Sequence, residues 1–196
     1  MNDIAQQDST SFRRNFLRSS SKLTLSAAAV ALLAGKEVLA AGSMGAPAHD
    51  IAILNIALGL EHEAINAYTL GAQSGLLAKP VLDVAVAFQG HHKGHRDALI
   101  ATIEKLGGTA VGEKSIDAYA KQLQADRIRS QSDILMLAQK LELGAANAYL
   151  SVIPSLQDKE LAKVAARLAA DETMHWTALS GALGTMLPST ALSFGA

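Results

Sequence analysis

The sequence predicts an all-α protein, an antiparallel four-helix bundle with one long connection between its second and third helices. The chain of 196 residues is rich in Ala and Leu, has 4% aromatic residues and contains four prolines. After residue 49, apolar residues recur every three or four positions, which is the period of an amphipathic helix. In addition, LEHEAINAY at 60–68 returns as LELGAANAY at 141–149, with six of nine positions identical. The repeat indicates two similar halves, each a pair of helices.

The first pair of helices is bounded by residues typical of helix ends. Asp50 is expected to cap the first helix, which continues to about Gln73 and is ended by Ser74 and Gly75. Pro80 suits the first turn of the second helix, which runs to the glycine pair at 107–108. Because the link between these helices is short, they should form an antiparallel hairpin.

The second pair has similar end signals. Ser132 is expected to cap the third helix, which stops near Pro154. The fourth helix should start near Asp158 and end at about Gly184. Residues 109–130, with a short helix expected at 115–123, then form the long connection between the two hairpins.

Each half also carries a Glu followed by a His-containing cluster, HHKGHRDAL at 91–99 and DETMHWTAL at 171–179. Glu61 and Glu142 are 81 residues apart. His95 and His175 are 80 residues apart. Residues i and i+3 lie on one face of a helix, so each His can act with the residue three positions before it. The predicted ligands of two metal ions inside the bundle are therefore Glu61, His92, His95, Glu142, Glu172 and His175.

The positions of the two repeated glutamates favour a metal. Glu61 and Glu142 each lie mid-helix on an apolar stripe, where an unpaired carboxylate would be very costly to bury. A divalent cation removes that cost. The alternative is a duplicated bundle that holds no metal.

Other polar residues near the repeat receive different expectations. Glu63 should be a solvated surface charge, and His91, one turn from His95, is a fallback ligand. Tyr68 and Tyr149 each follow the repeated Glu by seven residues, so we expect them in the core, with hydroxyls that bond to groups around the site.

The first forty residues resemble an export signal. SFRRNFLR at 11–18 contains paired arginines, an apolar run follows at 23–34, and VLAA at 38–41 ends in small residues. We interpret 1–40 as a twin-arginine signal peptide, which predicts a periplasmic protein. A short membrane anchor or a basic tail is the alternative, although the run is too short to span a bilayer comfortably. The remaining segments are a linker at 41–48, the bundle at 49–186 and a C-terminal tail at 187–196.

Composition excludes several classes of function. The chain has no cysteine, so disulfides, thiolate metal sites and thiol catalysis are excluded. Residues 1–40 hold five basic and three acidic residues, which leaves 12 basic and 15 acidic residues, a net charge of −3, in the remainder. That mild balance, with no basic stripe, argues against nucleic acid as a partner. We expect no stable membrane insertion after signal removal, and a homodimer is compatible with the sequence.

The helix DIAILNIALGLEHEAINAY at 50–68 and the repeated ligand pattern resemble the ferritin-like superfamily, in particular the bacterial ferritin-like domain proteins that include a desiccation-related group. The resemblance covers roughly residues 49–186. It implies that each half supplies a Glu and then Glu-x-x-His to a carboxylate-bridged di-iron or di-manganese centre. The second half matches fully, but His92 stands where the pattern expects Glu. This departure leaves three carboxylates and shifts preference toward iron, zinc or copper over manganese.

Two classes of function follow. The first is an exported protein with a dinuclear centre, iron first and manganese or zinc as alternatives, for metal oxidation, iron handling or oxidative-stress defence. Its enzymatic form would be a di-iron oxidoreductase of the ferroxidase type. The second is a non-catalytic periplasmic stress or structural bundle with a degenerate or single-metal site.

Overall fold

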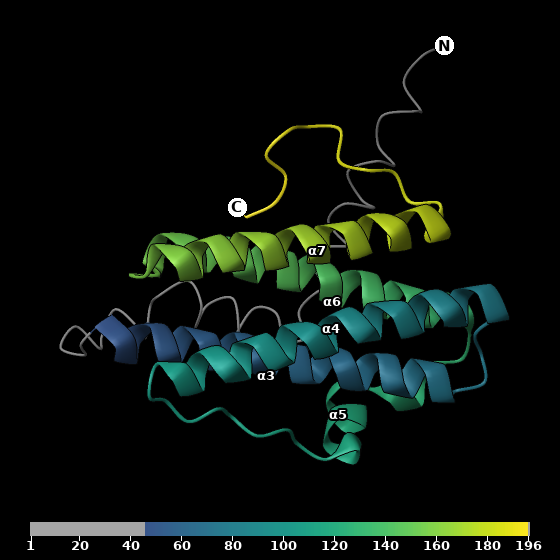
Figure 1. Ribbon diagram of the computed structural model, residues 1–196. Coiled ribbons are helices and arrows are strands. Elements are labelled where there is room, and N and C mark those ends of the chain that lie inside the picture. Colours follow the sequence, from purple (N-terminus) through teal and green to yellow (C-terminus); the bar gives the residue numbers. More distant parts are fainter. Residues whose placement is uncertain (1–45, 196) are drawn as a thin grey trace, which may run out of the picture.

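The computed structural model describes residues 46–195, and all regular structure in that range is helical. Four long helices dominate it (Figure 1): α3 (Ala46–Gln73), α4 (Lys79–Lys105), α6 (Gln131–Val152) and α7 (Lys159–Leu183). A short helix α5 (Ile116–Gln122) and two single turns, η3 (Ala125–Arg127) and η4 (Ile153–Ser155), complete the chain order. The predicted all-α class is confirmed. The predicted export signal at 1–40 lies outside the described residues.

The four long helices form two hairpins that pack as two layers. Figure 1 shows α3 beside α4 in one layer and α6 beside α7 in the other. The connection from 106 to 130 joins the layers and carries α5 along the outer side of α3. None of the helices within 46–195 combines the length and apolar character needed to cross a bilayer.

The helix boundaries follow local capping chemistry. Ser130, rather than the expected Ser132, caps α6, because its hydroxyl accepts from the Asp133 amide at 3.2 Å and donates to the Asp133 carboxylate at 2.8 Å. The first of these contacts satisfies one of the amides left unpaired at the start of the helix. Helix α7 starts next to Asp158, as expected, and Asp158 caps it by accepting from the Glu160 amide. Gly184 ends α7 with φ +65, a left-handed conformation that suits glycine.

Asp50 has a different role from the predicted one. Helix α3 begins at Ala46, inside the segment expected to be a linker, so Asp50 lies one turn within the helix rather than at its cap. Its carboxylate is 3% exposed and accepts from the backbone amides of Gln157 and Asp158, at 3.0 and 3.1 Å. Asp50 therefore satisfies orphan amides at the start of α7 and ties the two hairpins together.

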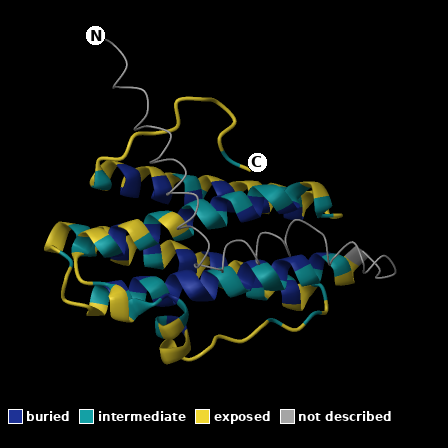
Figure 2. Ribbon diagram, turned by 180° about the vertical axis from the view of Figure 1, so that it is seen from behind, coloured by how far each residue is buried: buried dark blue, intermediate teal, exposed yellow. Residues whose placement is uncertain are grey.

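The core consists of two apolar layers with a polar layer between them. Figure 2 shows that the buried faces of the long helices turn toward each other. One apolar layer contains Leu54, Leu58, Leu99, Ile103, Leu161 and Leu168. The other contains Tyr68, Ala85, Phe88, Leu135, Ala138 and Leu179. Along every long helix, the predicted ligand positions fall between the residues of these two layers.

The long connection covers a face of α3 that was expected to be exposed. Glu63, predicted to be solvated, is only 4% exposed. Beside it, His62 is also buried, and its Nε2 contacts the carbonyl of Val111 at 3.2 Å. Burial raises the pKa of Glu63, while Gln122 of α5 and Lys114 lower it less strongly. The prediction was wrong because helical periodicity does not reveal where a non-repeating connection will lie.

The predicted C-terminal tail contacts the bundle. Residues beyond α7 return along α6 and α7, where the Phe194 ring packs edge-on against Trp176, with centroids 5.2 Å apart. The backbone amide of Gly195 donates to the side chain of Asn147 at 2.8 Å.

Candidate metal centre

The six residues predicted as ligands meet in the polar layer. They form two overlapping groups in which the potential ligand atoms lie within 4.8 Å of one another: Glu61, His92, His95 and Glu172, and His92, Glu142, Glu172 and His175. All six are buried, with exposed fractions of 0–8%. The structure thus brings together every predicted residue, and their role as metal ligands stays a prediction.

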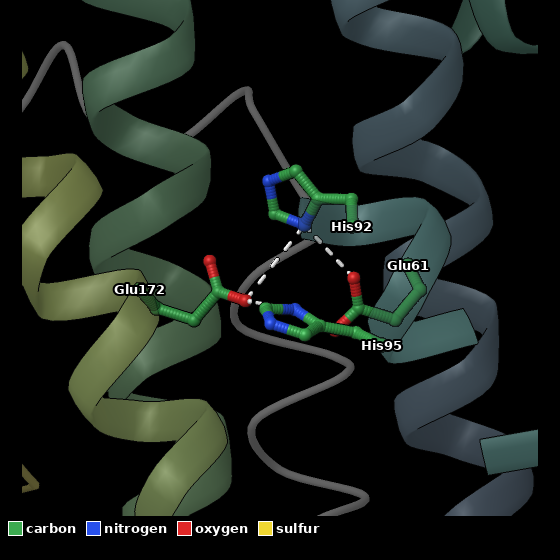
Figure 3. Close-up of side chains that lie close together, drawn as sticks. All are labelled: Glu61, His92, His95 and Glu172. Atoms are coloured by element: carbon green, nitrogen blue, oxygen red, sulfur yellow. Dashed lines mark hydrogen bonds and ion pairs between the residues drawn. The ribbon is translucent and has the colours of Figure 1, made fainter. Parts of the chain in front are cut away.

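The first group joins α3 and α4 to α7. Figure 3 shows Glu61, His92 and His95 facing Glu172 across the bundle. His92 Nδ1 lies 2.8 Å from Glu61 Oε2 and 3.7 Å from Glu172 Oε1. His95 Nδ1 lies 3.2 Å from Glu172 Oε1 and 3.6 Å from Glu61 Oε1.

The second group joins α6 and α7 to His92. His175 Nδ1 lies 3.3 Å from Glu142 Oε2 and 3.5 Å from Glu172 Oε2. His92 Nε2 lies 3.2 Å from Glu142 Oε1. Glu172 therefore presents one oxygen to each group, as a carboxylate placed between two ions would.

His92, the departure from the family pattern, also faces both groups. Its Nδ1 points to Glu61 and its Nε2 to Glu142, so the imidazole spans the two halves. A ring that donates from both nitrogens is an imidazolium, whereas a neutral ring leaves one lone pair for a metal. The position can thus compensate carboxylate charge or supply a ligand, but it cannot bring the negative charge of a Glu.

Two tyrosines bond to the glutamates across the bundle. Tyr68 of α3 donates its hydroxyl to Glu142 Oε1, and Tyr149 of α6 donates to Glu61 Oε1. Both tyrosines are buried, as predicted. Burial and the neighbouring carboxylates raise the pKa of each phenol, so both hydroxyls remain protonated donors.

The outer nitrogens of two histidines are held by residues that sequence reasoning did not assign to this role. His95 Nε2 contacts Asp171 Oδ2 at 3.1 Å. His175 Nε2 shares a hydrogen bond of 2.8 Å with His91 Nδ1. His91 is therefore a partner of His175 and belongs to neither ligand group, which corrects its expected role as a fallback ligand. These contacts turn Nδ1 of both rings inward, and such outer partners commonly orient metal-binding histidines.

Burial and opposite charge act together on the titration of the centre. Burial alone would raise the pKa of Glu61, but the imidazoles of His92 and His95 lower it to about 2. Burial would lower the pKa of His95, but Glu172 and Glu61 raise it to about 10. Burial and the adjacent Glu142 raise the pKa of Glu172 to about 7. Without metal, the histidines can thus be protonated and offset the carboxylate charge.

The donor set fits a divalent transition metal. His95 Nδ1 and both oxygens of Glu172 are buried and lack a hydrogen-bond partner in the described part of the chain. Polar atoms left unpaired in a protein interior are costly. His95 Nδ1 and Glu172 Oε1 face the first group and Glu172 Oε2 faces the second, where a cation would satisfy them. Carboxylate and imidazole together suit iron and zinc.

Comparison with known proteins supports the same architecture. The profile of a family described as "Ferritin-like domain" matches residues 49–185. A solved structure of a conserved hypothetical protein from Mycobacterium tuberculosis is similar in fold, with a TM-score of 0.61 and 23% identity over 72% of this chain and 94% of that chain. No curated protein matched the sequence.

Proposed function

This chain belongs to the ferritin-like domain family, and on that premise we propose that it holds two divalent metal ions, iron first, between its two hairpins. One ion would be held by Glu61, His95 and one oxygen of Glu172. The other would be held by Glu142, His175 and the second oxygen of Glu172. His92 lies in both groups and would add a nitrogen to either.

One observation carries the proposal. Glu172 is 0% exposed, neither of its oxygens has a hydrogen-bond partner, and it belongs to both ligand groups. A buried carboxylate is costly unless cations lie beside it. The imidazoles approach its oxygens only to 3.2–3.7 Å, and a metal ion beside each oxygen would satisfy it more fully.

The proposed activity is oxidation of ferrous iron by oxygen or peroxide, in the service of iron handling or oxidative-stress defence. Bound iron would supply the redox chemistry. The apolar layers on either side would exclude water from the centre. Tyr68 and Tyr149 stay protonated and donate to the glutamates, and Asp171 orients the His95 ring.

We further propose that the protein is exported to the periplasm by the twin-arginine route and belongs with the desiccation-related group of ferritin-like proteins. The paired arginines at 13–14 and the apolar run at 23–34 support export. This route carries folded proteins, so a centre filled before export would suit it.

A second candidate function is a non-catalytic bundle, in which the six residues form a buried ion-pair network. The distances of 2.8 and 3.2 Å from His92 to two carboxylates favour it, since an imidazolium there would satisfy both. Such a network needs no metal and would make the protein equally stable without one.

Metal analysis of protein purified from its native compartment separates the two candidates. We expect two iron ions per wild-type chain, and oxygen- or peroxide-dependent oxidation of added ferrous iron. Glu172→Gln should lose both ions because Glu172 is shared, whereas Glu61→Gln should lose one. Glu104→Gln, on the exposed surface of α4, is the control and should keep both. Wild-type protein that contains no metal and takes up none on titration would exclude the dinuclear centre.

A further inference from the structure

A large apolar cavity lies at the end of the bundle where α3 turns into α4. Its volume is about 320 Å³, within the usual range for small-molecule sites of roughly 300–1,000 Å³. All four long helices contribute to its walls, among them Leu70, Val81, Phe88, Leu135, Ala178 and Leu179. The predicted metal ligands do not line it.

The lining gives water little reason to stay. Among the described residues that line the cavity, Tyr68 alone carries a polar side chain, and its hydroxyl already donates to Glu142. Water needs two to four polar partners to occupy a protein cavity, whereas apolar cavities of half this size stay dry and bind hydrocarbons. The cavity is therefore suited to a hydrocarbon.

The inner end of the cavity rests on the centre described above. Phe88 lines the cavity and stacks on His175, with centroids 4.1 Å apart. The Tyr68 ring lies tilted by 32° against His92, with centroids 5.5 Å apart. A molecule in the cavity would thus be separated from the polar layer by these two rings.

A cationic residue, Arg129, lies beside the outer end of the cavity. A second cavity of about 290 Å³ shares five walls with the first, namely Leu70, Gly71, Ala125, Ile128 and Ile134. Its remaining walls include Ser74 and Arg129. Within residues 46–195, the Arg129 guanidinium makes one hydrogen bond, to the carbonyl of Ile128 at 3.0 Å. Four of its five N–H donors thus make no hydrogen bond within this range. A guanidinium pairs well with a carboxylate, to which it can donate two hydrogen bonds.

We propose that these two adjoining cavities, which share five lining residues, bind a single-chain fatty acid, with the hydrocarbon tail in the apolar cavity toward Tyr68 and Phe88 and the carboxylate at Arg129. An apolar interior with a cation at its mouth matches the two ends of such a molecule. The inference goes beyond the metal function and does not depend on it, because no predicted ligand contributes to the cavity.

Calorimetric titration of the full-length protein with dodecanoate tests the proposal, both on protein as isolated and after removal of metal by a chelator. We expect one molecule bound per chain in either state, so that failure of the metal proposal would leave this result intact. Affinity should fall about fourfold for each methylene removed, and thus about sixteenfold for decanoate, which has two fewer, because the tail is buried.

Two variants separate the tail from the head. Ala178, an exposed alanine, lines the cavity at its surface, so Ala178→Phe should place a ring over the opening and weaken binding at least tenfold. Ala166→Phe, at another exposed alanine of the same helix outside the cavity, should leave binding unchanged. Arg129→Gln should weaken dodecanoate about two- to fivefold, as expected for an exposed ion pair, and leave the neutral 1-dodecanol unaffected. If the Ala178→Phe ring turns outward, Ala182→Phe provides a second block of the same cavity.

Three results would overturn the proposal. The first is dodecanoate binding that Ala178→Phe and Ala182→Phe both leave unchanged. The second is binding to phosphatidylcholine vesicles without binding of free dodecanoate, which would point to a membrane surface. The third is a dimer that Ala178→Phe dissociates in a protein that binds no dodecanoate, which would assign the cavity to a second copy of the chain.

Discussion

The hydroxyl of Tyr68 bonds to Glu142 in the opposite hairpin, and not to Glu61, which precedes it by seven residues in its own helix. Tyr149 makes the matching contact with Glu61. The repeat in the sequence thus becomes a crossed pair of contacts, in which each half of the chain positions the glutamate of the other half.

Tyr68→Phe should therefore destabilise the protein and weaken its metal site together. Loss of the donor removes one of two hydrogen bonds to Glu142 Oε1, the other coming from His92, and a hydrogen bond to a charged group contributes about 1.5–3 kcal/mol to the free energy of unfolding. Loss of an orienting partner typically lowers metal affinity about 10–100-fold. Chemical denaturation and metal titration measure the two effects. Tyr119→Phe is the control, since its hydroxyl accepts from the Lys114 amide in the connection and its loss should not alter metal affinity.

His92→Glu should have opposite effects with and without metal. In the metal-free protein, a fourth carboxylate replaces the imidazole between Glu61 and Glu142, and breaking a buried pair in this way costs about 3–5 kcal/mol. With metal present, the new carboxylate can bridge both ions, so the variant should gain more in melting temperature on loading than the wild type does. In the wild type, we expect the Glu172/His175 half to bind metal more tightly than the His92/His95 half.

His92→Gln serves as the comparison, because it also removes the imidazole but adds no charge. It should melt lower than wild type and gain little from metal. A His92→Glu protein that melts lower and binds metal no more tightly than wild type would refute the bridging argument and favour the metal-free network.

The stability of the metal-free protein should be greatest in mildly acidic solution. The pKa of His95 is raised from 6.5 to about 10, so its contribution is complete below pH 6.5 and is lost as pH rises through 10. The pKa of Glu61 is lowered from 4.5 to about 2, so its contribution is complete above pH 4.5 and is lost as pH falls through 2. The pKa of Glu172 is raised from 4.5 to about 7, so its ionisation lowers the free energy of unfolding as pH rises through this range. Denaturation at about pH 6 and about pH 9 should show the lower stability at the higher pH, and His95→Gln should reduce the difference.

Metal loading should reverse this dependence. Ligands must lose their protons to bind a metal, so affinity rises with pH and binding releases protons. The loaded protein should thus be at least as stable at about pH 9 as at about pH 6. Equal pH profiles with and without added metal would contradict a metal at these residues.

Export should depend on the arginine pair. Replacing Arg13 and Arg14 together with Lys should block periplasmic accumulation while the protein still folds, because the twin-arginine route reads that pair. Fractionation of cells measures the distribution, and Arg18→Lys, in the same segment but outside the pair, should be exported normally. Normal export of the double variant would exclude this route.

The bundle and the centre were predictable from sequence because both depend on local periodicity and on an internal repeat. Apolar spacing places Glu61 and Glu142 on inward faces, and the repeat relates the two halves, so the positions of six residues follow without knowledge of the helix packing. The start of α7 near Asp158 was predictable for a similar reason, since the amide that Asp158 caps lies only two residues away.

The features that the sequence did not reveal depend on contacts between distant segments. Asp171 stands beside Glu172, and only the approach of α4 shows that its carboxylate reaches His95, 76 residues earlier. The burial of Glu63 requires the path of the long connection. Asp50 is of a residue type that often caps helices, but the amides that it accepts from are more than a hundred residues later in the chain.

The hydrogen bonds of Asp50 report on the docking of the two hairpins. Its two hydrogen bonds join positions 107 and 108 residues apart, so they form only when the hairpins have docked. Contacts over such separations are slow to form because the chain between them must first be ordered. The rate at which the Gln157 and Asp158 amide protons exchange with solvent would therefore report how often the hairpins separate. Since the six predicted ligands come from both hairpins, the rate at which the hairpins separate would also set how long a bound ion is retained.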